Sequence, residues 1–256
     1  MGPRLHSLRV APHRRCLADG DGVAAVLGYY PPFAAQPTHS HPIDQTTFVL
    51  LGGLHESRPG NDYEALCGWF GVKPAGCCHA NRFGREGALL VTIETADDAK
   101  HAQVGWSAGA DLQVVTGLVR TATDTAGSPL ATEAIRDLLA GAVRPRPRSR
   151  IPPRALALAR ERLHEEPEQC RIDSLAKHAG FDRTTFARMF RRHFGIPPSI
   201  YRARRMTAVA TRALLTERCS VADAAFAGGF ADHSHYTRSV RRFAGVTPKQ
   251  LRELLG

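Results

Sequence analysis

The fold of this chain is decided by a stretch that occurs twice near the end of the sequence. Residues 175–198 read LAKHAGFDRTTFARMFRRHFGIPP, and residues 224–248 read AAFAGGFADHSHYTRSVRRFAGVTP. The two copies are 49 residues apart up to Gly180 and Gly229 and 50 residues apart from Phe186 and Tyr236 onward, so the second copy has one more residue in its turn. A repeat of this size predicts that each copy is one supersecondary unit.

Each copy has the pattern of two helices joined by a short turn. In the first copy, Gly180 follows a short apolar helix and tolerates the positive φ that ends it. Phe186 and Phe190 are four residues apart and face inward together, which leaves Arg188 on another side of the second helix. A basic second helix of this kind fits the major groove of DNA, whereas the alternative is a pair of stacked hairpins with solvated arginines. The equivalent Arg238 in the second copy favours DNA binding.

The distribution of charge supports the same interpretation. The 256 residues carry a net charge of +10, but residues 144–256 hold 23 Lys and Arg against 10 Asp and Glu, whereas residues 1–143 hold 11 against 14. The half with the repeat is therefore the basic half, as phosphate binding requires. A chain of this length favours two domains.

The second copy also resembles the signature of the AraC/XylS family of bacterial transcription regulators. The residues that carry the resemblance are Ala225, Gly229-Phe230, Ser234, Tyr236, Arg238, Arg241-Arg242, Gly245, Thr247-Pro248 and Arg252. The resemblance covers about the last hundred residues, and it departs from the family at Val240, where Phe is usual, and at Ala244, where a bulkier residue is common. It implies a DNA-binding domain over residues 153–256, with helix-turn-helix motifs at about 172–194 and 221–243.

The residues expected to face DNA lie on the second helix of each motif. Those near the bases are Arg183, Thr184, Ala187 and Arg188 on the first, and His233, Ser234, His235 and Arg238 on the second. By resemblance, Arg188, Arg238, Thr184 and Ser234 hold family contact positions. Ala187 is short and suits only a thymine methyl group, and a solvated helix face is the alternative for His233 and His235. The arginines expected to contact phosphates, which sets register rather than sequence preference, are Arg191, Arg192, Arg241 and Arg242.

A long helix is expected between the two copies, at about residues 199–216. Apolar residues recur there every four positions on one side, and Arg202, Arg205 and Arg212 are expected to be available on other sides. At 1.5 Å per residue the helix is roughly 27 Å long, which approaches the distance of about 34 Å between successive major grooves on one face of DNA. One chain is therefore expected to enter two grooves, and bending of the DNA supplies the difference.

The N-terminal half has the pattern of short strands separated by Gly and Pro. The expected strands are Val23–Tyr30, Thr46–Leu51, Trp69–Val72, Ala88–Thr95 and Leu112–Val115. Strands at this spacing predict an all-β sandwich or a small barrel.

Two clusters in this half resemble the motifs of the cupin barrel. The first is His39-Ser40-His41 with Gln45 and Gly52, and the second is Gly68, Pro74, Gly76 and His79. Gln45 replaces the usual Glu, and Phe83 replaces an expected Asn. Effector domains of AraC-type regulators are commonly cupin-like, so the two resemblances support each other.

The cupin resemblance implies a candidate metal site. Metal-binding cupins hold a divalent ion on three His and one Glu, so that His39, His41 and His79 would be ligands here, with Gln45 a poor fourth. Neutral imidazoles suit Zn, Fe, Ni or Cu. The alternative is that these residues line a ligand pocket that holds no metal.

The remaining residues of note in this half have simpler interpretations. Cys77 and Cys78 are interpreted as small buried side chains rather than soft ligands. Glu56 and Tyr63 are interpreted as ordinary surface or strand residues, and the two tryptophans as core. All six cysteines, at positions 16, 67, 77, 78, 170 and 219, lack a Cys-x-x-Cys pattern and are expected to be free thiols in a reducing cytosol.

The segment between the two halves is expected to contain a helix and a tether. Ser128 has the character of an N-cap, and an apolar stripe runs from Leu130 to Ala142, which suits packing on the barrel or, as the family resemblance favours, on a second subunit. The alternating Arg and Pro of residues 144–153 predict an extended linker.

Together these features predict an α+β multidomain chain, with an N-terminal cupin-like β-barrel and an all-α domain of two helix-turn-helix motifs joined by a long helix. The expected boundaries are 1–127, 128–152 for the helix and linker, and 153–256. The expected function is effector-controlled, sequence-specific DNA binding in the cytoplasm, without catalytic residues. The expected partners are double-stranded DNA, a small molecule, a second copy of the chain and RNA polymerase. The alternatives are a metal-dependent cupin enzyme fused to a DNA-binding domain and a constitutive DNA-binding protein.

Overall fold

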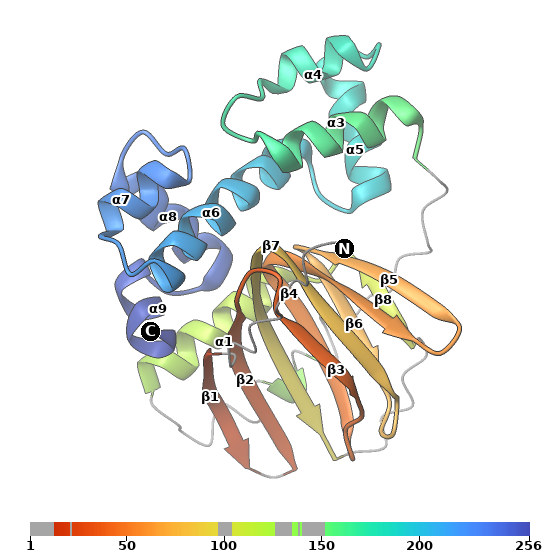
Figure 1. The fold of residues 1–256 in the computed structure, drawn as a ribbon, viewed down its shortest axis with the longest axis vertical. Coiled ribbons are helices and arrows are strands. Elements are labelled where there is room, and N and C mark those ends of the chain that lie inside the picture. The colour runs from red at the N-terminus through yellow and green to blue at the C-terminus, as the bar shows by residue number, and fades with distance from the viewer. Residues whose placement is uncertain (1–12, 21, 97–103, 126–134, 138, 140–151) are drawn as a thin grey trace, which may run out of the picture.

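The computed structural model describes residues 13–20, 22–96, 104–125, 135–137, 139 and 152–256. An antiparallel β-structure occupies the N-terminal part, and helices occupy the C-terminal part (Figure 1). The predicted α+β architecture is therefore confirmed. The predicted helix of residues 128–142 lies mostly outside the described residues, and so does the Arg/Pro tether of residues 144–153, of which only residues 152 and 153 are described.

Eight strands form one antiparallel sheet in the order β1-β2-β7-β4-β6-β8, with β3 paired to β7 and β5 paired to β4. Their bounds are β1 His13–Gly20, β2 Val23–Tyr30, β3 Ala35–His39, β4 Asp44–Arg58, β5 Asn61–Leu66, β6 Trp69–Lys73, β7 His79–Thr95 and β8 Gly105–Ala108. Side chains from seven of these strands, all except β5, line one common cavity, so the sheet is curled into the barrel form that the strand pattern predicted.

Two glycines allow the long central strands β4 and β7 to bend together. Gly52 and Gly87 both have positive φ, at 73° and 69°, and the β4–β7 register shifts beside Gly52. A Cβ at Gly52 would lie 2.0 Å from the carbonyl oxygen of Gly87, a distance that no side chain tolerates. Glycine at both positions is therefore a requirement of the curled sheet.

Residues 112–125 form helix α1 (Leu112–Thr125), so the strand predicted at Leu112–Val115 is wrong. Leu112, Val115, Val119 and Ala122 are buried at helical spacing, and the four residues of the predicted strand are too few to reveal that period. The Asp111 carboxylate accepts a hydrogen bond from the backbone N–H of Gln113 at 3.0 Å, which stabilises the start of the helix.

The C-terminal part consists of seven helices among the described residues. They are α3 Arg154–Glu165, α4 Ile172–His178, α5 Arg183–Phe194, α6 Pro198–Thr216, α7 Val221–Ala227, α8 His233–Ala244 and α9 Pro248–Leu255. Helices α4 and α5 form the first helix-turn-helix and α7 and α8 the second, and α6 runs between them across one end of the barrel (Figure 1). None of the described helices is long and apolar enough to cross a membrane.

The two parts of the molecule share one hydrophobic core. Leu27 and Val91 of the barrel, Val119 of α1, Leu214 of α6 and Tyr236 of α8 belong to the same buried cluster. Because both helix α6 and the second helix-turn-helix pack on the barrel, the sheet and these helices form one continuous body.

A buried ion pair joins the same two parts. Arg205 of α6 donates two hydrogen bonds to the Glu86 carboxylate of β7, at 2.6 and 2.7 Å, and it also donates to the backbone carbonyl of His164. The Arg205 and Glu86 side chains are 4% and 5% exposed. The expectation that Arg205 is available on an outer side of the helix is therefore wrong, because its guanidinium group is committed to the barrel.

Candidate DNA-binding surface and barrel cavity

Helices α5 and α8 are the second helices of the two motifs and were predicted to face DNA; they are called the reading helices below. They are built in the same way. Asp182 caps α5 by accepting hydrogen bonds from the backbone N–H groups of Thr184 and Thr185, and Asp232 caps α8 by accepting from that of His235. Each helix ends at a glycine with positive φ, Gly195 or Gly245. These signals fix where each helix begins and ends.

The inner faces of both helices are apolar and buried. Phe186, Phe190 and Phe194 of α5 pack into one core cluster, and Tyr236 and Val240 of α8 pack into the core shared with the barrel. Because these residues recur at helical spacing, the positions between them must face away from the core.

The outer faces carry the residues predicted to contact DNA. Ala187 of α5 is half-buried, and every other predicted residue is exposed. The exposed residues are Arg183, Thr184, Arg188, Arg191 and Arg192 on α5, and His233, Ser234, His235, Arg238, Arg241 and Arg242 on α8. Arg183 forms an ion pair with Asp173 of α4 at 3.1 Å. The His235 ring lies edge-on to Phe230, with ring centroids 5.0 Å apart. Both surfaces are thus accessible to a ligand as large as DNA.

Helix α6 holds the two motifs apart. It has 19 residues and is therefore about 28 Å long, with a helix-turn-helix at each end (Figure 1). Its buried residues include Thr207, Thr211 and Arg204 as well as apolar side chains, because it is packed against helices and sheet on several sides. Arg202, which the sequence placed on an outer side, donates hydrogen bonds to the carbonyls of Pro167 and Glu168 and so anchors α6 to the start of the first motif.

The barrel encloses a polar cavity of about 150 Å³. The predicted residues His39, His41, Gln45 and His79 all line it, together with Lys73, Asn81, Glu94 and Trp106 among others. The nearest possible ligand atoms of the three histidines lie within 4.8 Å of one another. The structure therefore brings together histidines from the two sequence clusters, although His41 and His79 are 38 positions apart in the sequence.

Backbone carbonyls hold two of these imidazoles in a defined orientation. His39 Nδ1 is 2.8 Å from the carbonyl oxygen of Pro37, and His79 Nδ1 is 3.1 Å from that of Cys77. Since a carbonyl only accepts, Nδ1 carries the proton in both rings and Nε2 keeps its lone pair. Burial lowers the pKa of His79 to about 4, and burial together with the neighbouring His39 lowers the pKa of His41. Near neutral pH the His41 and His79 rings are therefore uncharged, the form that binds metal ions.

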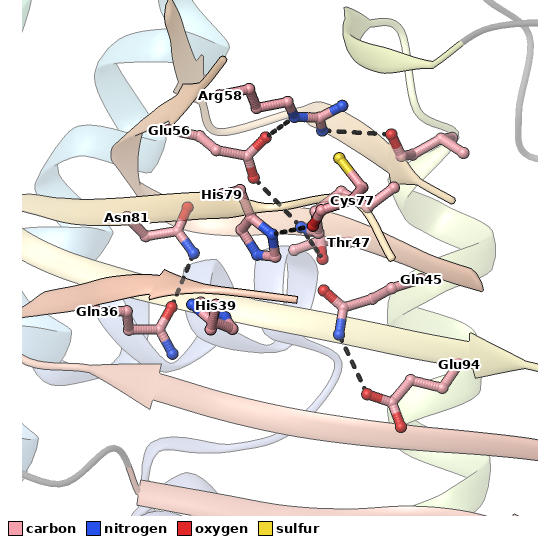
Figure 2. A network of polar contacts seen from close by, with 12 residues as sticks. Gln36, His39, Gln45, Thr47, Glu56, Arg58, Cys77, His79, Asn81 and Glu94 are labelled. Carbon is pink, nitrogen blue, oxygen red and sulfur yellow. Dashed lines mark hydrogen bonds and ion pairs between the residues drawn. The ribbon is translucent and has the colours of Figure 1, made fainter. Parts of the chain in front are cut away.

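A buried charge cluster adjoins the histidines (Figure 2). Glu56 is fully buried and pairs with Arg58 at 2.6 Å and with Lys73 at 3.3 Å; Lys73 also donates to the Thr47 hydroxyl. Burial opposes ionisation of Glu56, but Lys73 and Arg58 outweigh it and hold the pKa of this carboxyl below its usual range. Glu56 is a residue of strand β4, one of the two expected alternatives, but it is not an ordinary surface residue: it is fully buried and pairs with Lys73, which lines the cavity.

Three further expectations about this half are answered by the structure. Trp106 is 2% exposed, as a core residue should be, but it also lines the cavity; Trp69 is half-buried. Cys77 is half-buried and Cys78 is exposed, so their interpretation as buried side chains is wrong, because they lie in the turn before β7. Tyr63 is a half-buried residue of strand β5.

Gln45 and Glu94 lie side by side across strands β4 and β7. They are register partners, and Gln45 Nε2 donates a hydrogen bond to Glu94 Oε1 at 3.1 Å (Figure 2). The same carboxylate oxygen lies 3.9 Å from His41 Nδ1. Sequence reasoning missed Glu94, although alternation along the predicted strand of residues 88–95 places it on the side opposite to the fully buried Val91 and Ile93.

Comparison with known proteins defines the class of the helical part. Residues 175–254 match the model of a helix-turn-helix domain. The virulence regulon transcriptional activator VirF of Yersinia enterocolitica is 34% identical over 82 residues, which are 32% of this chain and 30% of that protein. The HTH-type transcriptional regulator ExsA of Pseudomonas aeruginosa is 30% identical over 83 residues, with the same shares.

The C-terminal part is therefore a helix-turn-helix domain of the kind found in transcription regulators. Its two motifs and the long helix between them agree with the AraC-type arrangement that the second copy of the repeat resembles. The chain spans less than a third of the length of the curated relatives it matches.

Solved structures similar to the barrel include KdgF from a Halomonas species, which is 19% identical and covers 34% of this chain and 80% of that one, with a TM-score of 0.31. They also include the DMSP lyase DddQ from Ruegeria pomeroyi, which is 24% identical and covers 40% of this chain and 55% of that one, with a TM-score of 0.33.

Proposed function

We propose that this chain is a sequence-specific DNA-binding transcription regulator of the AraC type. The observation that carries the proposal is the pair of equivalent helices, α5 and α8, each with a buried apolar inner face and an exposed basic outer face, held at the two ends of α6. Two such helices on one rigid strut suit successive major grooves of one DNA duplex.

The roles of the outer residues follow from their positions. Arg188 and Arg238, with Thr184 and Ser234, lie on the exposed faces of the two reading helices and are proposed to contact base edges. The arginines of the last turns are proposed to bind phosphates. These are Arg191, Arg192, Arg241 and Arg242.

Selection of bound DNA from a random pool by the full chain tests the proposal. We expect the recovered sequences to share two short conserved blocks whose centres are about 10 to 11 base pairs apart, because the two helices enter successive grooves. Recovery of unrelated sequences, or of a single block, would show that the two helices do not read DNA together.

The barrel cavity is proposed to bind a small polar effector. Two buried polar atoms in its wall, Trp106 Nε1 and Asn81 Oδ1, have no hydrogen-bond partner within the described part of the chain. A buried donor and a buried acceptor without partners are costly unless a ligand or water satisfies them. An effector with both an acceptor and a donor fits this wall.

Strand β7 connects this cavity to the DNA-binding helices. His79, Asn81 and Glu94 of β7 line the cavity, and Glu86 of the same strand pairs with Arg205 of α6. An effector that binds one arrangement of β7 better than another would therefore also change how α6 presents its two motifs. A panel of small oxygenated molecules tests this part of the proposal. Each molecule is scored by the shift that it causes in the thermal unfolding temperature of the wild type and of Trp106→Phe. A molecule that shifts both proteins equally does not use the indole N–H.

A further inference from the structure

We propose that the effector of the barrel cavity is a small hydroxycarboxylate anion. Its carboxylate group is bound by Lys73 and Trp106, and its hydroxyl group donates to Asn81. The inference rests on the proposed function, because it names the chemical class of the molecule that the cavity binds. It concerns only the barrel, so it can fail while the proposal about DNA binding stands.

The buried charges beside the cavity do not balance. Glu56 carries one negative charge and shares it between two cations, Arg58 at 2.6 Å and Lys73 at 3.3 Å, whose side chains are only 6% and 4% exposed. Arg14 and Glu94, which also line the cavity, carry opposite charges that sum to zero. Burial lowers the pKa of the Lys73 ammonium group, and the Glu56 carboxylate opposes this shift only in part. Because a buried cation is costly unless it is paired, the cluster favours one further negative charge.

Lys73 and Trp106 provide two hydrogen-bond donors for that charge. Lys73 Nζ donates to Thr47 Oγ1 at 3.2 Å and to Glu56 Oε2 at 3.3 Å, which leaves the third proton of the ammonium group for a ligand. The Trp106 ring lies beside it on the neighbouring strand, with its centroid 5.5 Å from Nζ, and Trp106 Nε1 is a buried donor without a partner among the described residues. Hydrogen bonds from such donors to a carboxylate are among the stronger ones in proteins.

An unpaired acceptor in the same cavity calls for a second group on the ligand. Asn81 Nδ2 donates to Gln36 Oε1 at 2.8 Å, but Asn81 Oδ1 is buried without a partner in the part of the chain that the structure describes. A carboxylate only accepts hydrogen bonds, whereas a hydroxyl group can donate to this oxygen. An ammonium group on the ligand would also donate, but it would add to the positive charge that the cluster already carries. The ligand therefore has a carboxylate and a hydroxyl group.

Glu94 is too distant from Lys73 to prevent an anion from binding there. Gln45 is the register partner of both residues, so it lies between them across strands β6, β4 and β7. Two strand spacings separate Lys73 from Glu94, roughly 10 Å. The Glu94 side chain is also 33% exposed, so water screens its charge more than that of the buried Lys73.

The volume of the cavity limits the size of the acid. It is about 150 Å³, and an engineered protein cavity of that volume binds benzene, so a ligand of about six non-hydrogen atoms fits. Glycolate, lactate, glycerate and 3-hydroxybutyrate are hydroxycarboxylates close to this size.

Calorimetric titration of the full chain with these acids tests the inference, with a chelator present so that no metal ion contributes. Each acid is compared with its amide, which has the same shape without the charge, and lactate is also compared with propionate, which lacks the hydroxyl group. We expect saturable binding of at least one acid at one site per chain, and roughly tenfold or greater losses for its amide and for removal of the hydroxyl group. Lys73→Met should abolish binding, and Trp106→Phe should weaken it by about tenfold. Lys177→Met, which removes an exposed lysine of α4, is the matched control and should bind as the wild type does.

Thermal unfolding without any ligand tests the unbalanced charge by itself. Lys73→Met leaves Glu56 paired with Arg58 and removes the excess charge, so this variant should melt at or above the temperature of the wild type. A clear loss of stability in Lys73→Met, no binding of any acid, or equal binding of acids and amides would each overturn the inference. Equal binding would still support a polar effector. Because no DNA is present, every outcome is independent of the result of the DNA selection.

Discussion

At the scale of single residues, Arg238 is the sharpest test of how this molecule recognises DNA. It is exposed on α8, and the side chains on either side of its turn, Tyr236 and Val240, are buried. Arg238→Ala should weaken binding to the selected DNA by about 1–3 kcal/mol and relax the preference at one base pair, because a bidentate contact to guanine is lost. Fluorescence anisotropy on the selected site and on its single-base variants measures both effects.

Lys249→Ala is the control for that experiment. Lys249 is an exposed cation on α9, outside the two reading helices, where it pairs with Glu253 at 3.9 Å. The substitution Lys249→Ala should alter neither the affinity for DNA nor the preference among single-base variants of the site. If Arg238→Ala weakens cognate and random DNA by the same factor, Arg238 contacts phosphate rather than a base.

His164 supplies a prediction about pH. Burial, reinforced by the guanidinium groups of Arg205 and Arg160, lowers the pKa of His164 to about 3, while Glu64 opposes the shift. Its pKa in the unfolded chain is about 6.5, so the unfolded state binds the proton first as pH falls. The contribution of His164 to stability is therefore complete above about pH 6.5 and is lost toward pH 3, at up to about 1.4 kcal/mol per pH unit.

Denaturant unfolding at a series of pH values measures this loss. In His164→Gln the slope of unfolding free energy against pH should be smaller between about pH 6.5 and 4 than in the wild type. Equal slopes in the wild type and in His164→Gln would mean that folding does not lower the pKa of His164.

At the scale of elements, the sequence predicts best where a signal is repeated. The two helix-turn-helix motifs are confirmed because caps, glycines and inward-facing aromatic residues recur in both copies. Strands β2, β4, β6 and β7 overlap the predicted ones, since each has an apolar run. Strands β1, β3, β5 and β8 were missed, because they are short or carry polar and small residues that pair with neighbours only in the folded sheet.

The cavity shows the same limit at a finer level. The three histidines could be placed together because their motifs resemble those of the cupin barrel. Lys73 and Glu94 could not, because their role depends on which strands are neighbours. Likewise, nothing in the sequence around Arg205 distinguishes a buried arginine from an exposed one; its acid, Glu86, lies 119 residues away.

The contact between α8 and α1 gives a prediction at this scale. Gly245 ends α8 with φ 83°, and a Cβ there would lie 2.3 Å from the backbone carbonyl oxygen of Thr116 in α1. Gly180 has a similar φ of 76° but nothing within 4 Å of such a Cβ. Gly180→Ala should therefore cost only backbone strain, about 1–2 kcal/mol, whereas Gly245→Ala should cost clearly more.

Chemical denaturation of both variants provides the comparison. The difference between their unfolding free energies reports the clash alone, because each substitution places alanine in the same left-handed conformation. Equal losses in the two variants would show that α8 does not rest on α1 in solution.

At the scale of the whole molecule, the barrel and the DNA-binding helices should unfold together. They share one hydrophobic core, and the ion pair between Glu86 and Arg205 is buried at their junction. The two motifs held by α6 are thereby kept in one orientation relative to the barrel cavity. The proposed effector would have to alter this orientation to change DNA binding. A single cooperative transition in the wild type is the expected consequence.

The ion pair itself can be tested by a double-mutant cycle on the full chain. Glu86→Leu leaves the buried Arg205 without its acid and should cost about 3–5 kcal/mol. Arg205→Met should cost less, because Glu86 keeps its ion pair with the exposed Arg85 at 3.1 Å. Either change should split thermal unfolding into two steps, because the junction loosens before the separate parts melt. The double variant leaves no unpaired charge and should be more stable than either single variant. Purely additive losses of unfolding free energy, measured by denaturant unfolding, would show that the two side chains do not interact in solution. A single thermal transition in every variant would show that the shared apolar core holds the two parts together without the ion pair.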